Sequence, residues 1–459
     1  MSTTVGQRVD LRVDGLTHDG QGVGRVDGMA CFVPGALPGE MVAAQLVHRA
    51  RRHWIAELVG VIEPAPERRQ PPCILAQRCG GCSLQHLEDG AELAWKGSRV
   101  QQALERLGGL QSSVAPALAA PATLGYRNRA IIPLERREDG LVRAGYYRRG
   151  THRIVNMNHC PVLDPRLDAL IAPLKADLDD AGWPVDRELQ AGGGLRHLAL
   201  RLGQHTGELL LTLVSSHAEL DQLPRWADRW LKRWPELVGV TLNLQPLATN
   251  TLLGPCTELV AGRSWLVERF AGLELRIASD TFFQVNTPQA ERVVPLLQNA
   301  LASQPPGLLI DAYCGIGTFG LPLARCGWRV HGLERNPEAV RLAEHNAAAN
   351  GLEAVASFEA GAVAELLPAW LERCQAVFLD PPRKGLEPAV LEALRHGPPA
   401  TLLYLSCDPA TLARDLALLL EGELFALDQL QPLDFFPQTS HVETLAVLRR
   451  SDAQPPAHG

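Results

Sequence analysis

The sequence LLIDAYCGIGTFG, residues 308–320, has the pattern of a buried strand that ends in a glycine turn. A helical pattern, TFGLPLARCG, follows it, and then come the strand WRVHGLE and the helix NPEAVRLAEHNAAANG. Later strands are QAVFLD, TLLYLSC and HVETLAVLRR. Alternating strands and helices predict an α/β domain built on a doubly wound, mostly parallel sheet.

Two acids follow strands of this segment. Glu334 ends WRVHGLE, and Asp380 ends QAVFLD within the motif FLDPPRKGL. The carboxyl ends of parallel strands meet at one edge of a sheet, where a glycine turn admits a ligand and a carboxylate can accept hydrogen bonds from both hydroxyls of a ribose. The arrangement resembles S-adenosylmethionine-dependent methyltransferases more than dinucleotide-binding proteins. An ordinary turn with solvated acids is the alternative.

Cys407 comes directly after the strand TLLYLS, at the same predicted edge. A thiolate there can add to carbon 6 of uracil, which makes carbon 5 nucleophilic enough to take a methyl group. A base must then remove the proton from carbon 5, and Glu443, at the start of HVETLAVL, is the candidate. Exocyclic-amine methyltransferases usually place an aromatic residue after the two prolines, where this chain has Arg383, so carbon methylation is favoured. The alternative for any single cysteine is an inert core residue.

The first 60 residues have the pattern of a small closed β-barrel. Short alternating segments are separated by glycine turns, a pattern that is typical of barrels that bind oligonucleotides on one face. Basic residues gather in HRARRH, residues 48–53, although a solvated loop explains them equally well. The proline-rich residues 64–72 predict a linker.

The middle of the chain combines basic and aromatic residues. Residues 121–153 hold eight arginines and three acids, with Tyr126, Tyr146 and Tyr147 among them. That mixture suits phosphate pairing and stacking on unpaired bases, and the alternative is the exposed face of a sheet. Helical spacing in residues 93–107 and strand-like runs within residues 195–275 predict an α+β domain here.

The ten cysteines are unevenly spaced. Cys73, Cys79 and Cys82 lie on one short segment, and Cys160 could join them through folding. Four thiolates suit an iron–sulfur cluster or zinc. A structural zinc site usually has two C-x2-C pairs, so the spacing favours a cluster over zinc or unligated thiols. Methyl transfer is not a redox reaction, so we expect a structural or RNA-shaping role for the cluster.

Length and charge set the remaining expectations. A chain of 459 residues predicts two to four domains. The net charge is −7, but residues 307–459 hold 11 basic and 19 acidic residues, so a polyanion must be met by basic patches in the first part. No apolar run reaches the roughly 20 residues that cross a bilayer, and the start lacks the apolar core of a signal peptide. We therefore expect a cytoplasmic protein with no membrane partner and no obligate protein partner.

The motifs DAYCGIGTFG, LDPPRKGL, YLSCDPATLARDL and FPQTSHVETLAVL resemble the RNA uracil-C5 methyltransferase family over nearly the whole chain. The N-terminal barrel resembles a TRAM domain, and the cysteine set resembles the iron–sulfur members that act on 23S ribosomal RNA. The resemblance implies Cys407 as nucleophile and Glu443 as proton acceptor. It implies a 4Fe–4S cluster on Cys73, Cys79, Cys82 and Cys160, and S-adenosylmethionine contacts from Gln284, Tyr313, Glu334 and Asp380. This chain has Thr318 and Asp408 where the family often has Asn, which puts only the cofactor contact of Thr318 in doubt.

The expected organisation is a TRAM/OB-like RNA-binding barrel at 1–62, a central α+β iron–sulfur and RNA-binding domain at 63–270, and a Rossmann-like methyltransferase domain at 271–450. A helix within 93–123 is expected to pack on the methyltransferase domain. The expected activity is methylation of uridine carbon 5, with 23S ribosomal RNA as the favoured partner. Three alternatives remain: a tRNA uracil-C5 methyltransferase, a non-catalytic RNA-binding iron–sulfur protein, and a small-molecule methyltransferase. The last would leave the barrel and the arginines unexplained.

Overall fold

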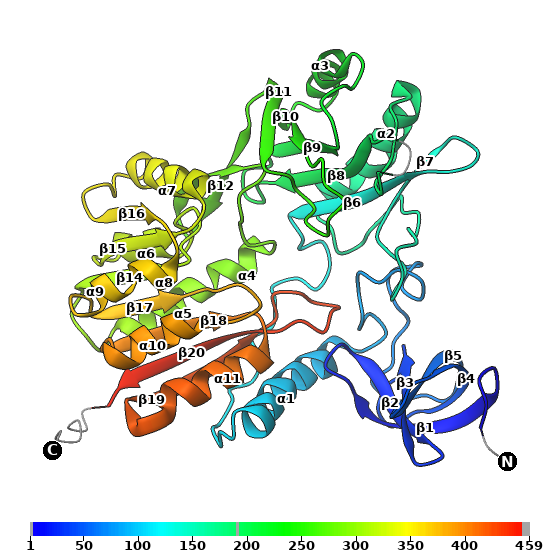
Figure 1. Ribbon diagram of the computed structural model, residues 1–459, viewed down its shortest axis with the longest axis horizontal. Coiled ribbons are helices and arrows are strands. Elements are labelled where there is room, and N and C mark those ends of the chain that lie inside the picture. Colours follow the sequence, from blue (N-terminus) through cyan, green and yellow to red (C-terminus); the bar gives the residue numbers. More distant parts are fainter. Residues whose placement is uncertain (1–2, 190–191, 452–459) are drawn as a thin grey trace.

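The N-terminal segment forms a closed five-stranded barrel in the computed structural model, which describes residues 3–189 and 192–451 (Figure 1). Apolar side chains alternate into its core, which holds Leu11, Val33 and Trp54. Gly24 lets two strands approach closely, because a Cβ there would lie 2.3 Å from the carbonyl oxygen of Arg12. The barrel order is β1-β2-β3-β5-β4, with β1 (Arg8–Leu16), β2 (Gln21–Val26), β3 (Met29–Pro34), β4 (Met41–Arg49) and β5 (His53–Glu63).

A six-stranded sheet in the order β11-β10-β9-β8-β6-β7 forms the centre of the chain. Its pairs are antiparallel except β9 and β10, which are parallel and joined by a crossover through α3. Trp183, Trp226 and Trp230 pack together under that crossover. The elements are β6 (Arg129–Arg136), β7 (Val142–Ala144), α2 (Pro165–Ala181), β8 (Leu195–Leu202), β9 (Leu209–Ser215), α3 (Leu223–Arg233), β10 (Leu237–Leu244) and β11 (Cys256–Gly262). A two-stranded sheet, β12 (Trp265–Phe270) and β13 (Leu273–Ala278), follows.

The C-terminal part is a seven-stranded sheet in the order β16-β15-β14-β17-β18-β20-β19, and it confirms the predicted α/β fold. Its first five strands are parallel, and β20 lies antiparallel between β18 and β19. The strands are β14 (Leu308–Ala312), β15 (Arg329–Glu334), β16 (Ala356–Ala360), β17 (Ala376–Leu379), β18 (Thr401–Ser406), β19 (Phe425–Leu433) and β20 (Glu443–Arg450). The helices are α4 (Thr287–Glu291), α5 (Val293–Leu301), α6 (Gly320–Arg325), α7 (Pro337–Ala349), α8 (Val363–Leu366), α9 (Pro368–Leu371), α10 (Pro388–His396) and α11 (Pro409–Leu420), with the 3₁₀ turn η1 (Glu421–Glu423).

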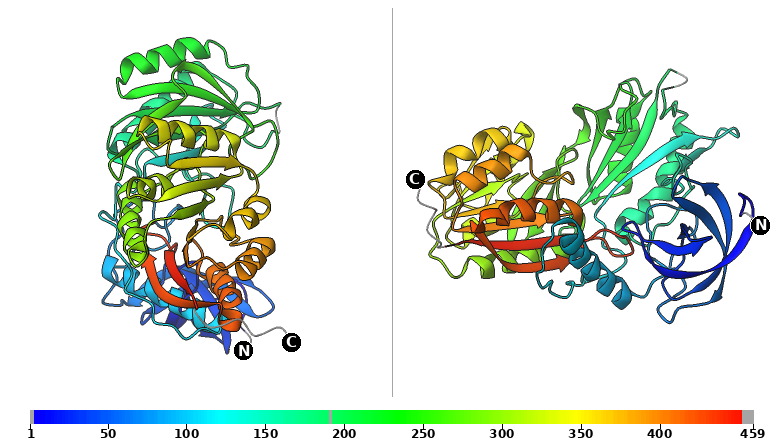
Figure 2. Two further views of the ribbon diagram at one scale, coloured as in Figure 1. Left: turned by 90° about the vertical axis from the view of Figure 1, so that its left-hand side faces the viewer. Right: turned by 60° about the horizontal axis from the view of Figure 1, so that its bottom comes forward.

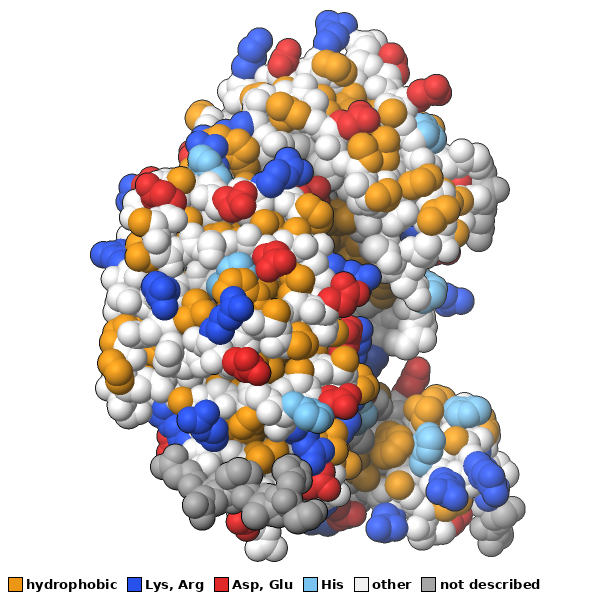
Figure 3. All heavy atoms as spheres, turned by 60° about the vertical axis from the view of Figure 1, so that its left-hand side comes forward, with side chains coloured by type: hydrophobic (Ala, Val, Ile, Leu, Met, Phe, Trp, Pro, Cys, Tyr) orange, Lys and Arg blue, Asp and Glu red, His pale blue; other side chains and the backbone are white. Residues whose placement is uncertain are grey.

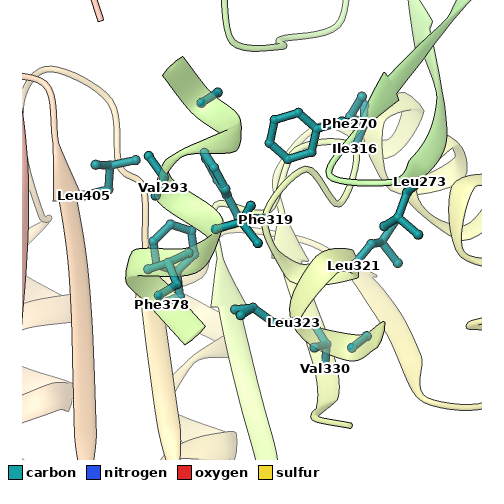
Figure 4. Packing of buried hydrophobic residues seen from close by; sticks show 14 of the residues in the cluster. Phe270, Leu273, Val293, Ile316, Phe319, Leu321, Leu323, Val330, Phe378 and Leu405 are labelled. Atoms are coloured by element: carbon teal, nitrogen blue, oxygen red, sulfur yellow. The ribbon is translucent and has the colours of Figure 1, made fainter. Parts of the chain in front are cut away.

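Both faces of this sheet are covered by apolar packing. On one face Phe319 contacts Phe270 and Phe378 edge to face, with ring centroids 5.9 Å and 5.5 Å away (Figure 4). Phe270 comes from β12, so the two-stranded sheet contributes to this core. The opposite core includes residues of α10 and α11 and receives Val100 and Leu104 from a helix far earlier in the chain.

That helix is α1 (Asp89–Leu107), which packs against α11 and lies between the seven-stranded sheet and the barrel (Figure 2). The seven-stranded sheet and the barrel lie at opposite ends of the molecule (Figure 1). No helix in the described ranges is long and apolar enough to cross a bilayer.

The helix after β14 begins later than its sequence indicates. Tyr313, Gly315 and Gly317 all have positive φ angles of 69°, 55° and 84°. Left-handed residues cannot continue a right-handed helix, so α6 begins only at Gly320. The delay leaves a loop at the carboxyl end of β14.

Candidate active site

The register of β18 and β20 places Cys407 opposite Glu443. Ser406 pairs with Thr444 in this antiparallel ladder, so continuing the register by one residue puts the two side by side. Because β20 is antiparallel, its first residue lies at the edge where the parallel strands end. Neighbouring side chains across such a pair point to the same face of the sheet. Asp380, directly after the adjacent strand β17, completes this group.

The Cys407 thiol is mostly neutral at physiological pH. Burial is the main cause that raises its pKa to about 11, and the nearby carboxyls of Glu443 and Asp380 add to the effect. Arg383 opposes them and lowers the pKa. The next residue, Asp408, caps α11 by accepting hydrogen bonds from the backbone nitrogens of Ala410 and Thr411. The nucleophile candidate therefore lies in the turn between β18 and the capped start of α11.

Glu443 and Asp380 form a coupled acidic pair. Burial first, and then Asp380, raise the pKa of Glu443 well above its ordinary value, while Arg383 lowers it. Burial raises the pKa of Asp380 to about 7. Glu443 Oε2 is buried and has no hydrogen-bond partner within the described residues, so it is free to act on a bound molecule. A carboxylate with a raised pKa is a stronger base once ionised.

The four predicted cofactor residues gather at the same edge. Tyr313, Glu334 and Asp380 lie at the ends of the neighbouring strands β14, β15 and β17, and Gln284 Nε2 donates to Asp380 Oδ2 at 3.3 Å. Glu334 accepts hydrogen bonds from the backbone nitrogens of Gly315, at 3.1 Å, and Asn336, at 2.8 Å. It thereby holds the loop after β14 beside its own carboxylate.

The glycines do not by themselves identify the ligand. Gly315, Gly317 and Gly320 have the G-x-G-x-x-G spacing that dinucleotide-binding folds also use. Gly320 is required by packing, because a Cβ there would lie 2.5 Å from Asp311 Oδ2. Burial, and then the charge of Asp380, raise the pKa of Asp311 well above its ordinary value.

Two residues near the nucleophile were not identified as functional from the sequence. Arg383 Nη2 lies 3.3 Å from His441 Nε2, and burial followed by the charge of Arg383 lowers the pKa of His441 to about 4. His441 is therefore neutral at physiological pH and can accept a hydrogen bond from Arg383. Both residues could have been inferred from the sequence, because Arg383 shares the motif LDPPRKGL with Asp380 and His441 shares the motif HVE with Glu443.

The loop before Glu443, which is part of the motif FPQTSHVETLAVL, is held by contacts with the segment after Cys82. Gln438 is fully buried with a φ of 70°, and its carbonyl oxygen accepts from the backbone nitrogens of Ser83 and Leu84. The backbone nitrogen of Ser440 donates to Ser83 Oγ at 2.9 Å. The segment directly after Cys82 is thus joined to the segment directly before Glu443.

The four selected cysteines lie within electrostatic reach of one another. Burial is the main cause that raises the pKa of Cys82 to about 12, and the charges of Cys160 and Cys79 contribute to that rise. Burial also raises the pKa of Cys160 to about 11, with added effects of Cys79 and Cys73. Within residues 3–189 and 192–451, however, no three His, Cys, Asp or Glu side chains are placed to hold a metal ion together. A thiol set of this kind fits a thiophilic metal chemically, because metal binding would stabilise the thiolates.

The arginines of 121–153 are spread over several environments. Arg136 donates to the carbonyl oxygens of Gly140 and Trp183, and Arg129 is half-buried and lies near the charge of Asp280, so both are engaged within the protein. Arg143, Arg148 and Arg153 instead surround one hollow. These arginines therefore do not share one environment.

Comparison with known proteins adds to this geometry. A family model described as tRNA (Uracil-5-)-methyltransferase matches residues 91–451, and a TRAM domain model matches residues 2–58. An RNA methyltransferase of Parasynechococcus marenigrum (strain WH8102), itself described as uncharacterized, is 52% identical over 447 residues, 97% of this chain and 96% of the relative. One from Bacillus cereus (strain ATCC 10987 / NRS 248) is 34% identical and covers 96% of both chains.

A solved structure is similar over almost the entire chain. The tRNA (uracil-54, C5)-methyltransferase of Pyrococcus abyssi, in complex with S-adenosyl-L-homocysteine, has a TM-score of 0.76 and 27% sequence identity. The similarity covers 95% of this chain and 99% of that one.

Proposed function

Since the chain belongs to the RNA uracil-C5 methyltransferase family, and so catalyses S-adenosylmethionine-dependent methylation of uracil in RNA, we propose that its target is a uridine of 23S ribosomal RNA and that Cys407 and Glu443 carry the reaction. The observation that carries the mechanism is the register that sets Cys407 beside Glu443, one strand away from Asp380.

Cys407 first gives up its thiol proton to solvent, and the resulting thiolate adds to carbon 6 of a uracil turned out of its stack. The sulfur–carbon bond forms, and the electron pair of the carbon 5–carbon 6 double bond moves to carbon 5 and the adjacent carbonyl. Arg383 supports this step because its charge lowers the pKa of the thiol. S-adenosylmethionine supplies the methyl group that carbon 5 attacks.

Glu443 completes the reaction. Its ionised carboxylate takes the proton from carbon 5, the double bond re-forms, and the sulfur of Cys407 leaves carbon 6. The low-polarity surroundings that raise the pKa of Glu443 make its carboxylate a better base for a carbon-bound proton. The proton then passes from Glu443 to solvent, which balances the replacement of hydrogen by methyl.

The cofactor would be held by the strand-end residues. Glu334 is positioned to accept the ribose hydroxyls, and Gln284, Tyr313 and Asp380 surround the same edge. We place a 4Fe–4S cluster on Cys73, Cys79, Cys82 and Cys160, with a structural role. The cluster rests on the resemblance to the iron–sulfur members of the family and on the chemistry of four thiols that lie near enough to affect one another's pKa.

Ribosomal RNA is proposed because a TRAM barrel together with the cysteine set resembles the members that act on 23S ribosomal RNA. The alternative is tRNA, which is the substrate named for the Pyrococcus abyssi relative. Basic and histidine side chains on the barrel lobe (Figure 3) are suited to either RNA.

Mapping of 5-methyluridine distinguishes these targets. Purified protein, labelled S-adenosylmethionine, and separate ribosomal RNA and tRNA from a strain that lacks the enzyme are incubated, and the products are digested and identified by mass spectrometry. Label in 5-methyluridine of 23S ribosomal RNA supports the proposal. Label confined to tRNA replaces it with the alternative, and no label in either RNA favours a non-catalytic protein.

A further inference from the structure

Four arginines surround a hollow of about 330 Å³ in the central part of the chain, and none of the residues of the candidate active site lines it. This volume is at the lower end of the range of about 300–1,000 Å³ that is typical of ligand pockets. Its lining is basic and carries no acidic residue: Arg78, Arg143, Arg148, Arg153, Ile154, Val155 and Asn156.

Three separate segments place these guanidinium groups. Arg78 belongs to the segment from Cys73 to Cys82, here called the cysteine segment, and Arg143 lies on β7. Arg148 and Arg153 close a turn, in which the backbone nitrogen of Arg148 donates to the carbonyl oxygen of Arg153 at 2.8 Å. The cysteine segment is fastened to that turn, because Cys79 forms a β-bridge with Arg148 and the backbone nitrogen of Gly80 donates to the carbonyl oxygen of Tyr147 at 2.8 Å. The hollow is thus built by folding, not by one run of basic sequence.

The positive charge around the hollow is only partly balanced. Arg143 pairs with Glu135 at 2.6 Å, and Arg148 approaches Glu57 of β5 at 3.6 Å with both side chains more than half exposed. Arg78 and Arg153 have no carboxylate within salt-bridge distance in the part of the chain that the structure describes. An anion that enters the hollow would therefore gain attraction without breaking an existing buried pair.

We propose that this hollow binds a phosphate group of the substrate RNA. Planar guanidinium groups match phosphate oxygens in two-point hydrogen bonds, and several arginines directed into one concave site recognise a single anion better than a spread of surface charge. The same chemistry would accept free phosphate or a mononucleotide, so the experiment must separate the sources. The inference rests on the proposed function only in that RNA is the substrate.

The position of the hollow gives the RNA contact a direction. Arg148 links it to β5 of the barrel through Glu57, and Arg78 and Cys79 are neighbours in the cysteine segment. An RNA strand whose phosphate is held in the hollow would lie between the barrel and the central sheet. Figure 3 shows an indentation between two lobes there. The cysteine segment then has a role in RNA binding, because it supplies one wall of the site.

The test compares two double variants of the full-length protein. Arg78→Ala/Arg153→Ala removes the two unpaired guanidinium groups, and Arg225→Ala/Arg229→Ala removes two exposed arginines of α3 in the same part of the chain. The dissociation constant of each protein for ribosomal RNA and for tRNA is measured against potassium chloride concentration. We expect the first variant to bind more weakly to the RNA class that the enzyme methylates. Its plot of log affinity against log salt concentration should have a slope smaller by about 1, as loss of one phosphate contact requires. Iron content and S-adenosylmethionine affinity should equal those of the wild type.

An equal loss in both variants, or no loss in the first, overturns the proposal. Inorganic phosphate and uridine monophosphate are titrated in parallel. If either binds the wild type at micromolar concentration, and the first variant loses that binding but keeps its RNA affinity, the hollow is a small-anion site and the RNA assignment is wrong. Failure to form 5-methyluridine would reject the proposed function separately, because RNA binding is measured without S-adenosylmethionine.

Discussion

Lys96 Nζ donates to Asp434 Oδ1 at 2.6 Å, although the two residues are 338 positions apart. The same ammonium donates to Glu92 Oε1 at 2.6 Å and to the carbonyl oxygen of Phe436 at 3.1 Å, and its side chain is fully buried. Helix α1 therefore holds the start of the loop that ends at Glu443. Loss of this contact would lower the stability of the protein and would also change the position of the proposed base, Glu443.

Replacing Lys96 with Met should destabilise the protein by about 3–5 kcal/mol, because two buried carboxyls lose their shared cation. The free energy of unfolding is measured in urea by circular dichroism. Lys232→Met, which removes an exposed lysine of α3, is the control and should change it little. Adding Glu92→Gln and Asp434→Asn to Lys96→Met should recover part of the loss. An unchanged stability in Lys96→Met would mean that the buried ion triad contributes nothing.

The covalent mechanism predicts opposite defects at its two ends. Cys407→Ala should bind cofactor and RNA but form neither adduct nor product, because carbon 5 is never activated. Glu443→Gln should complete addition and methyl transfer but fail to remove the proton, so a methylated protein–RNA adduct should accumulate.

A denaturing gel with RNA and S-adenosylmethionine shows that adduct as a shifted band. RNA with 5-fluorouridine at the target should trap the wild type in the same way, since fluorine cannot leave as a proton does. Residual turnover in Cys407→Ala would contradict the covalent mechanism. A wild-type rate without adduct in Glu443→Gln would require another base.

Loss of the Glu334 carboxylate should weaken S-adenosylmethionine binding by roughly 1–3 kcal/mol, the usual cost of a charge-assisted hydrogen bond. Glu334→Ala is compared with Glu338→Ala, which removes a carboxylate from the first turn of α7. Isothermal titration calorimetry gives both affinities. An affinity for Glu334→Ala equal to that of the wild type would exclude Glu334 from the cofactor site.

Arg383 should control the ionisation of Cys407. With a pKa of about 11 the thiol is mostly protonated at neutral pH, so its alkylation by iodoacetamide should accelerate about tenfold per pH unit until that pKa is approached. Arg383→Ala removes the charge that lowers this pKa, so alkylation at any given pH should slow, and Arg383→Lys should restore most of the rate. Mass spectrometry of the peptide that contains Cys407 reports the rate. Arg395→Ala, on α10, is the control. An equal rate in Arg383→Ala and the wild type would show that Arg383 does not act on the thiol.

The cysteine set predicts about four irons per chain in protein purified without oxygen, as a four-iron cluster requires. Cys79→Ser and Cys160→Ser should each lose iron, whereas Cys256→Ser, an exposed cysteine of β11, should keep it. Iron and zinc are measured by inductively coupled plasma mass spectrometry, with the visible spectrum as a second readout. Zinc in place of iron, or full iron in Cys160→Ser, would contradict the assignment.

Several sequence-based expectations depended only on local pattern. The alternation of strands and helices after residue 307 predicted the α/β sheet, and the glycine-separated strands before residue 60 predicted the closed barrel. Glu334, Asp380 and Cys407 were expected at one edge because all three follow parallel strands. The late start of α6 was missed, since the left-handed backbone of Tyr313, a residue with a Cβ, has no local signal in the sequence.

The sequence by itself determined the alternation of strands and helices and the strand ends that carry Glu334, Asp380 and Cys407, and it indicated candidates for the nucleophile, the base and the metal ligands. The tertiary structure decided which of them meet. Glu443 lies beside Cys407 only because β20 is antiparallel to β18 in the sheet. Lys96 contacts Asp434 only because α1 packs on α11. Arg78 and Arg153 line the same hollow only because Cys79 pairs with Arg148. The reason is physical: periodicity and residue type report which face of an element avoids water, whereas the partner of that face depends on contacts between segments that are distant in the chain.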